Sequence, residues 1–156
     1  LWLDRYYYDE AYHNGDVWLW LSGAWVSALD DAREGYQQTD MLLTEALAEG
    51  AVGTIQEIRD GDPAATNDEF GGATSQAWSL SELLRTVAED YAGIRVDLSV
   101  EPPRVEVNPQ VPAQWPELAV TQRVGEYLLR VRAHPDGRGL IVDGIPKEWL
   151  IDSVRP

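Results

Sequence analysis

The 156-residue sequence contains no cysteine, and it also lacks long apolar runs and a recognisable signal peptide. Without cysteine the chain can form neither disulfides nor thiolate metal sites, and we expect neither a metal nor another cofactor. Because there is no run of about 18 apolar residues, no membrane span is predicted. The missing signal peptide favours a cytoplasmic protein. The sequence begins at Leu1 rather than at a methionine, so we expect a piece of a longer protein.

Positive charge is scarce as well. Asp and Glu number 27 against 12 Lys and Arg, which gives a net charge of −15, and Lys147 is the only lysine. This charge would repel nucleic acids and anionic membranes, so we expect neither as a partner. Dense acidic charge with almost no lysine indicates a salt-adapted source, because high salt screens the self-repulsion of the chain.

The aromatic residues are an uneven mixture of seven Trp and seven Tyr against one Phe. Trp and Tyr combine an apolar ring with a polar atom and are favoured where a ring is partly wet. Sugar stacking and protein interfaces are two such places, and packing in the core is a third explanation. Since 44% of the residues are hydrophobic, the chain has enough apolar material for the core of one domain, or of a small domain with an appendage.

Hydrophobic residues at helical spacing predict three helices, at residues 17–34, 40–49 and 75–92. Each is followed by a glycine, the residue that most readily ends a helix: Gly35, Gly50 and Gly93. Thr39 is the predicted N-cap of the second helix, and the third begins at either Ser75 or Ser79. Between the second and third helices lies a long loop rich in Gly, Asp and Pro. We expect Val52, Ile55 and Ile58 to anchor its start and residues 63–72 to be mobile.

After Gly93 the pattern changes to short alternating segments rich in β-branched residues, at 94–100, 104–109, 118–124, 126–134 and 139–145. The "PDG" at 135–137 predicts a hairpin turn between the last two. Helices followed by a small antiparallel sheet make an α+β chain. We therefore predict two domains, at residues 1–94 and 95–156.

Three stretches in order resemble the C-terminal part of bacterial and archaeal glycogen debranching enzymes, the amylo-α-1,6-glucosidases. They are "AYHNGDVWLWLSGAWVSAL" at 11–29, "GAVGTIQEIRDGDP" at 50–63 and "GGATSQAWSLSELLR" at 71–85. A more distant resemblance is to glucoamylases. Both families fold as an (α/α)6 toroid, with the sugar site at the N-terminal ends of the inner helices. The resemblance implies that residues 1–94 are the last helices of such a toroid and 95–156 a β-rich tail.

The resemblance also implies inverting hydrolysis, in which an acid and a base lie about 6.5–9.5 Å apart across the sugar. Glu57, inside "TIQEIRDGDP" at 54–63, matches the base. Independently of the family, Ile55 and Ile58 would shield its carboxylate from bulk water, while Arg59 would either hold it ionised or brace the loop. The alternative is an ordinary solvated loop glutamate. The family's general acid lies upstream of these segments, so this chain alone is expected to be inactive.

The toroid would bring several residues to the rim that holds Glu57. From the resemblance we expect the substrate-binding residues to be His13, Trp18, Asp60, Gln76 and Trp78. His13 has a helix-capping role as its alternative. A stacking ring is expected from Trp18 or Trp20, although Trp20 and Trp25 fit the core better. Leu19 stands where the family usually has a proline, and the stretch after "DGDP" lacks the usual His and Arg, which leaves linkage and chain-length preference open.

The expected function is therefore that of part of a glycosidase, which cleaves α-1,6 branch linkages in glycogen or a related α-glucan with inversion. Its partners would be the glucan or a maltooligosaccharide and the upstream part of the same polypeptide, and exposed helix faces would favour self-association. Two alternatives stay open. One is an inverting disaccharide phosphorylase, although no glycine-rich phosphate loop is recognisable. The other is a non-catalytic glucan-binding or interaction module.

The charge balance generates a first prediction. Raising NaCl from tens of millimolar toward molar concentration should raise the melting temperature of the chain, because salt screens the repulsion among its excess carboxylates. A thermal melt followed by circular dichroism at several salt concentrations measures this. A melting temperature that stays constant across the series would refute the salt-adapted interpretation.

Overall fold

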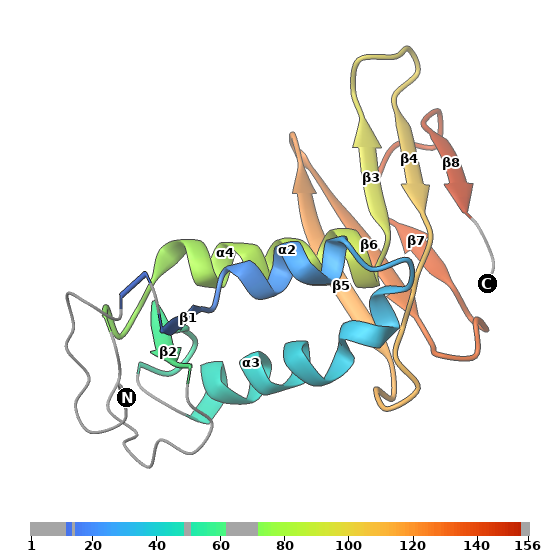
Figure 1. Ribbon diagram of the computed structural model, residues 1–156. Coiled ribbons are helices and arrows are strands. Elements are labelled where there is room, and N and C mark those ends of the chain that lie inside the picture. The colour runs from blue at the N-terminus through green and yellow to red at the C-terminus, as the bar shows by residue number, and fades with distance from the viewer. Residues whose placement is uncertain (1–11, 14, 49–50, 62–71, 154–156) are drawn as a thin grey trace. The chain divides into compact units, whose positions relative to one another are not determined.

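The computed structural model describes residues 12–13, 15–48, 51–61 and 72–153 (Figure 1). The segment predicted to be mobile, 63–72, lies outside these ranges except for Gly72. The chain divides into two compact units. The first unit comprises Leu1–Ser22 and Gln38–Leu83, and the second comprises Gly23–Gln37 and Leu84–Pro156. Within the described ranges no helix has the length and apolar character needed to cross a membrane.

The described residues combine helices with small sheets, which confirms the α+β class. The helical elements are α2 (Leu21–Ser27), the 3-10 helix η1 (Ala32–Gly35), α3 (Tyr36–Ala48), α4 (Ala77–Arg85) and the π-helix η2 (Thr86–Tyr91). The strands of the first unit are β1 (Asp16–Trp18) and β2 (Ile58–Asp60), which pair antiparallel.

The first predicted helix, residues 17–34, is wrong at both ends. Val17 and Trp18 belong to β1, where Trp18 lies opposite Ile58 of β2. Such β-branched and aromatic residues favour strands once a partner strand is available. The helix α2 is only seven residues long. At the other end, the Asp31 side chain accepts a hydrogen bond from the Arg33 backbone N–H and starts the separate helix η1.

The second predicted helix begins a turn earlier than expected. Thr39 is not its N-cap but a buried residue inside α3, with 2% of its surface exposed. The reason is that η1 leads directly into α3: Tyr36 has helical dihedrals and its N–H donates to the Arg33 carbonyl. The third helix starts with α4 at Ala77, midway between the two predicted starts Ser75 and Ser79, and continues as η2 to Tyr91. Gly93 follows with φ of +63°, as its predicted place after the helix requires.

The second unit contains two three-stranded sheets where one antiparallel sheet was predicted. The first has the order β3 (Ile94–Asp97), β4 (Arg104–Val107), β8 (Leu150–Ser153), and the second β5 (Leu118–Val124), β6 (Tyr127–Ala133), β7 (Ile141–Asp143). The pair β4–β8 is parallel, which corrects the all-antiparallel expectation. The "PDG" turn is confirmed, since Gly137 N–H donates to the His134 carbonyl between β6 and β7.

The core of the second unit lies where the alternating strands bury every other residue. On β4 these are Val105 and Val107, both fully buried, and on β6 they include Leu129 and Val131. They pack in one cluster with the completely buried Tyr91 at the end of η2. Alternating burial of this kind is what the period-2 geometry of a strand produces, and both strands lie within segments that the sequence predicted as strands.

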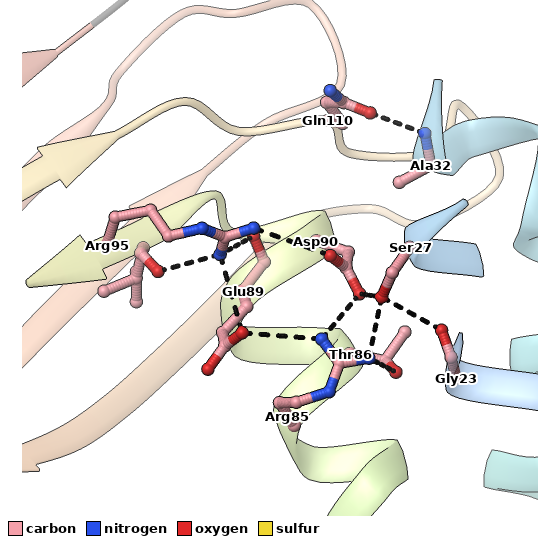
Figure 2. Close-up of polar contacts among 10 residues, drawn as sticks. Gly23, Ser27, Ala32, Arg85, Thr86, Glu89, Asp90, Arg95 and Gln110 are labelled. Atoms are coloured by element: carbon pink, nitrogen blue, oxygen red, sulfur yellow. Dashed lines mark hydrogen bonds and ion pairs between the residues drawn. The ribbon is translucent and has the colours of Figure 1, made fainter. Parts of the chain in front are cut away.

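A polar cluster fastens the α4–η2 helix to the end of α2 within the second unit (Figure 2). Ser27 donates to the Asp90 carboxylate at 2.8 Å and accepts from the Arg85 guanidinium at 2.7 Å. Arg85 also pairs with Asp90 at 3.2 Å, while Arg95 donates to the Glu89 carbonyl at 2.7 Å. The hydroxyl, guanidinium and carboxylate groups of this cluster are hydrogen-bonded to one another, so we interpret the cluster as structural.

Two glycines with nearly equal dihedrals give a matched test of packing in this unit. Gly93 and Gly125 have φ of +63° and +60°, but a Cβ at residue 93 would lie 2.8 Å from the Asn108 backbone nitrogen, whereas residue 125 faces open space. We expect Gly125→Ala to lower the free energy of unfolding by about 1–2 kcal/mol through backbone strain alone. Gly93→Ala should cost about 1–3 kcal/mol more, because the methyl group forces the backbone apart. Urea denaturation of both variants measures this, and equal losses would contradict it.

Candidate functional site

Glu57 lies immediately before β2, and its backbone is held from two sides. Its N–H donates to the Ala73 carbonyl at 3.0 Å, and its carbonyl accepts from the Leu19 N–H at 3.4 Å. Ile55 and Ile58, the residues expected to shield it, are 1% and 0% exposed, whereas Val52, which was expected to anchor the same segment, is 74% exposed and does not. Glu57 itself is 8% exposed. The solvated loop glutamate is therefore the wrong description of this residue.

The two carboxylate oxygens of Glu57 have separate hydrogen-bond donors. The Tyr12 hydroxyl donates to Oε1 at 2.6 Å, and the Ala73 backbone N–H donates to Oε2 at 3.0 Å. The Gln76 side chain adds a further hydrogen bond to the carboxylate. Gly72 has φ of +66°, and a Cβ there would lie 3.1 Å from the Glu57 carboxyl carbon. Only a glycine therefore fits against this side of the carboxylate.

These contacts determine the charge of Glu57. The Tyr12 hydroxyl, the Ala73 N–H and the Gln76 side chain lower its pKa below the usual glutamate value, and this outweighs burial, which acts in the opposite direction. The side chain is thus a buried carboxylate that is ionised at neutral pH. Each carboxylate oxygen has two lone-pair directions, so the oxygens keep acceptor capacity beyond the bonds to Tyr12 and Ala73. Such a group can accept a proton from a water molecule.

Arg59 braces the neighbouring segment. Its guanidinium forms an ion pair with Glu45 of α3 at 2.8 Å, and the Glu45 side chain is only 4% exposed. Arg59 was predicted either to hold Glu57 ionised or to brace the loop, and this ion pair corresponds to the bracing role. The described donors to Glu57 are neutral groups.

An aromatic cavity of about 570 Å3 is the second feature of the first unit, and it is lined by His13, Trp18, Trp20, Leu21 and Trp78. The rings of His13 and Trp18 are nearly parallel, with centroids 5.6 Å apart and 9° between their planes. Trp78 is 52% exposed. Trp20 and Trp25 are 38% and 49% exposed, so the core position that the sequence favoured for them is wrong. Trp20 lines the cavity, as its alternative role of a stacking ring requires.

Tyr12 connects the cavity wall to the carboxylate. The edge-on ring of Tyr12 has its centroid 4.9 Å from that of His13 and 4.6 Å from that of Trp18, while its hydroxyl contacts Glu57. The indole N–H of Trp18 donates to the Tyr12 backbone carbonyl at 2.9 Å. Sequence reasoning did not select Tyr12, although it immediately precedes His13. The only available signal was its position inside the "AYHNG" motif.

Among the predicted site residues, the structure brings His13, Trp18 and Trp78 together at the cavity, and Gln76 to Glu57. Asp60 lies on β2 opposite Asp16, and its side chain is outside the described part of the structure. Within the described ranges, no group of three or more His, Asp or Glu side chains is arranged to hold a metal ion.

Comparison with known proteins supplies one match. The family model described as amylo-alpha-1,6-glucosidase matches residues 4–85, which is more than half of the chain. The matched range contains Glu57, its three donors and every residue that lines the aromatic cavity. Searches among curated proteins and among solved structures gave no match.

The lowered pKa of Glu57 predicts a pH-dependent contribution to stability. Its unfolded-state pKa is about 4.3, and its folded-state pKa is lower, so its contacts stabilise the fold above that pH. This stabilisation is lost as the pH falls through the folded-state pKa. At pH 7 we expect Glu57→Gln to lower the free energy of unfolding by about 1–3 kcal/mol, because a buried donor loses its charged acceptor. At lower pH the difference from the wild type should shrink.

Chemical denaturation between pH 7 and pH 3 measures this difference. Glu34→Gln is the control, because Glu34 is exposed on η1 and its loss should change the unfolding free energy little. A penalty for Glu57→Gln that is equally large throughout the pH range would contradict the ionised state of the native carboxylate.

Proposed function

We propose that this chain, which belongs to the amylo-alpha-1,6-glucosidase family, carries the general base of a glycosidase that cleaves α-1,6 branch linkages in glycogen or a related α-glucan with inversion. The observation that carries the proposal is Glu57, a buried ionised carboxylate next to residues that line an aromatic cavity. A buried carboxylate without an ion-pair partner among its donors suits a base better than a structural ion pair does.

In the proposed reaction, Glu57 takes a proton from a water molecule as the water oxygen attacks the anomeric carbon of the branch glucosyl unit. The bond from that carbon to the glycosidic oxygen breaks on the opposite face, and a general acid protonates the leaving oxygen. Tyr12 and Ala73 hold the base in place and ionised before the water binds. Because attack and departure occur on opposite faces, the configuration at the anomeric carbon inverts.

The aromatic cavity is the proposed binding site for the glucan. Apolar faces of glucose rings stack on Trp and Tyr, and His13 can both donate to and accept from hydroxyl groups. The indole N–H of Trp18 already donates to the Tyr12 carbonyl. Trp18 would therefore contact a sugar through its ring face and not through a hydrogen bond from this N–H. We include Trp20 with the predicted His13 and Trp78, because it lines the same cavity. Asp60 and Gln76 stay as proposed polar contacts.

We propose further that the general acid comes from an upstream part of the same polypeptide. In this arrangement α2, α3 and α4 are the last helices of an (α/α)6 toroid, and the domains comprise residues 1–94 and 95–156. Hydrolysis then needs both parts of the polypeptide. A non-catalytic glucan-binding module is the second candidate function. It is favoured by the fact that Glu57 does not line the aromatic cavity.

The direct test is Glu57→Gln in the polypeptide that contains both the base and the acid. Loss of a positioned general base reduces turnover by about 10²–10⁴-fold. We expect kcat for glucose release from a branched dextrin to fall in that range, while the affinity for a maltooligosaccharide, measured by calorimetry, changes little.

Two variants make this test specific. Glu34→Gln, an exposed carboxylate, should leave kcat unchanged. Trp78→Ala should lower the affinity for the maltooligosaccharide, because it removes a half-exposed wall of the cavity. If Glu57→Gln keeps most of its turnover, Glu57 is not the base. A polypeptide that binds the oligosaccharide and never releases glucose would instead establish the non-catalytic module.

A further inference from the structure

We propose that Tyr12 is a positioning residue that fixes the Glu57 carboxylate next to the aromatic cavity, and that Trp18 holds Tyr12 in place for this task. The inference rests on the proposed function, in which Glu57 is the base. It assigns Trp18 a role beyond the sugar-stacking contact expected from the sequence.

The contact between Tyr12 and Glu57 has the geometry of a charge-assisted hydrogen bond. Its oxygen–oxygen distance of 2.6 Å is within the range of about 2.5–2.7 Å for a hydroxyl donating to a carboxylate. The two residues are 45 positions apart in the sequence, so the bond also joins two distant segments of the first unit. A tyrosine hydroxyl is a weak acid, and it can therefore donate to the base without neutralising it.

Trp18 restrains Tyr12 at two points. Its indole N–H donates to the Tyr12 backbone carbonyl at 2.9 Å, and its ring meets the Tyr12 ring edge-on, with 74° between the planes. The backbone and the ring of Tyr12 are thus both restrained by one residue of β1. Since Trp18 also lines the cavity, the wall that would contact the glucan is joined through Tyr12 to the Glu57 carboxylate.

The second oxygen of Glu57 is restrained independently. The Ala73 N–H donates to Oε2, and Gly72 leaves no room for a side chain on that side. With Tyr12 on Oε1 and Ala73 on Oε2, and Gln76 as a further donor, both oxygens of the carboxylate are held. If the Tyr12 hydroxyl is removed, Oε1 loses its short hydrogen bond, and the carboxylate gains freedom to rotate about the contacts that remain.

Tyr12→Phe isolates this role, because it keeps the aromatic ring and removes only the hydroxyl. We expect the pKa of Glu57 to rise, which carbon NMR titration of the glutamate carboxyl groups in this chain measures, with Glu57→Gln used to assign the signal. In the active polypeptide, the acid limb of the kcat/KM profile should move to higher pH. We expect kcat to fall roughly tenfold, as loss of a hydrogen bond to a charged group implies, and KM for a maltooligosaccharide to stay unchanged.

Tyr127→Phe is the matched control. Tyr127 is also next to a glutamate, Glu126, which raises the pKa of the Tyr127 hydroxyl, but it lies in the second unit. Its removal should leave the Glu57 titration and the pH profile unchanged. Trp18→Phe is a second variant, which keeps an aromatic ring and removes the N–H donor to Tyr12. It should raise the pKa of Glu57 in the same direction as Tyr12→Phe.

The outcomes separate this inference from the proposed function. A Glu57 titration that is unchanged in both Tyr12→Phe and Trp18→Phe overturns the inference, whatever the activity of the enzyme. A raised pKa without any change in the kcat/KM profile also overturns it, because Tyr12 would then be only structural. A Glu57→Gln enzyme that keeps its turnover overturns the proposed function, even where the titrations behave as expected.

Discussion

The burial of one ionised carboxylate is the constraint on which the first unit depends. An unpaired charge taken out of water costs several kcal/mol, and the cost must be offset by hydrogen bonds. Glu57 receives these from Tyr12, from Ala73 and from Gln76, which come from two segments on either side of it in the sequence. The same contacts therefore hold distant parts of the first unit together and set the charge of the proposed base. A substitution that removes one of these hydrogen bonds therefore affects both the stability of the first unit and the charge of Glu57.

A second buried carboxylate, Glu45, is stabilised in a different way, by an ion pair. Glu45 of α3 is stabilised by the guanidinium of Arg59, one full charge against another. The donors described for Glu57 are neutral instead. An adjacent cation would stabilise the negative charge more strongly and make the carboxylate a poorer proton acceptor. Neutral donors keep it ionised and still basic enough to accept a proton from water.

The sequence predicted those features that depend on local pattern. Alternation predicted the strands β4 and β6, and the two isoleucines around Glu57 predicted its burial. Features set by distant partners were missed. β1 forms because β2 pairs with it across about 40 residues, and all four residues of β8 are exposed, so neither had a local signal. Tyr12 was one of seven tyrosines until the fold placed its hydroxyl on Glu57.

Trp18 connects the proposed binding site to the proposed base. Its ring belongs to the cavity wall, and its N–H holds the backbone of the residue that restrains the base. A ring that only stacked on sugar would be free to move with the ligand. This one contacts Tyr12 through both its N–H and its ring, so a glucan bound at the proposed site would meet a wall that is already ordered. The conformational entropy of ordering Tyr12 and Glu57 is then lost during folding, and little further ordering is needed when substrate binds.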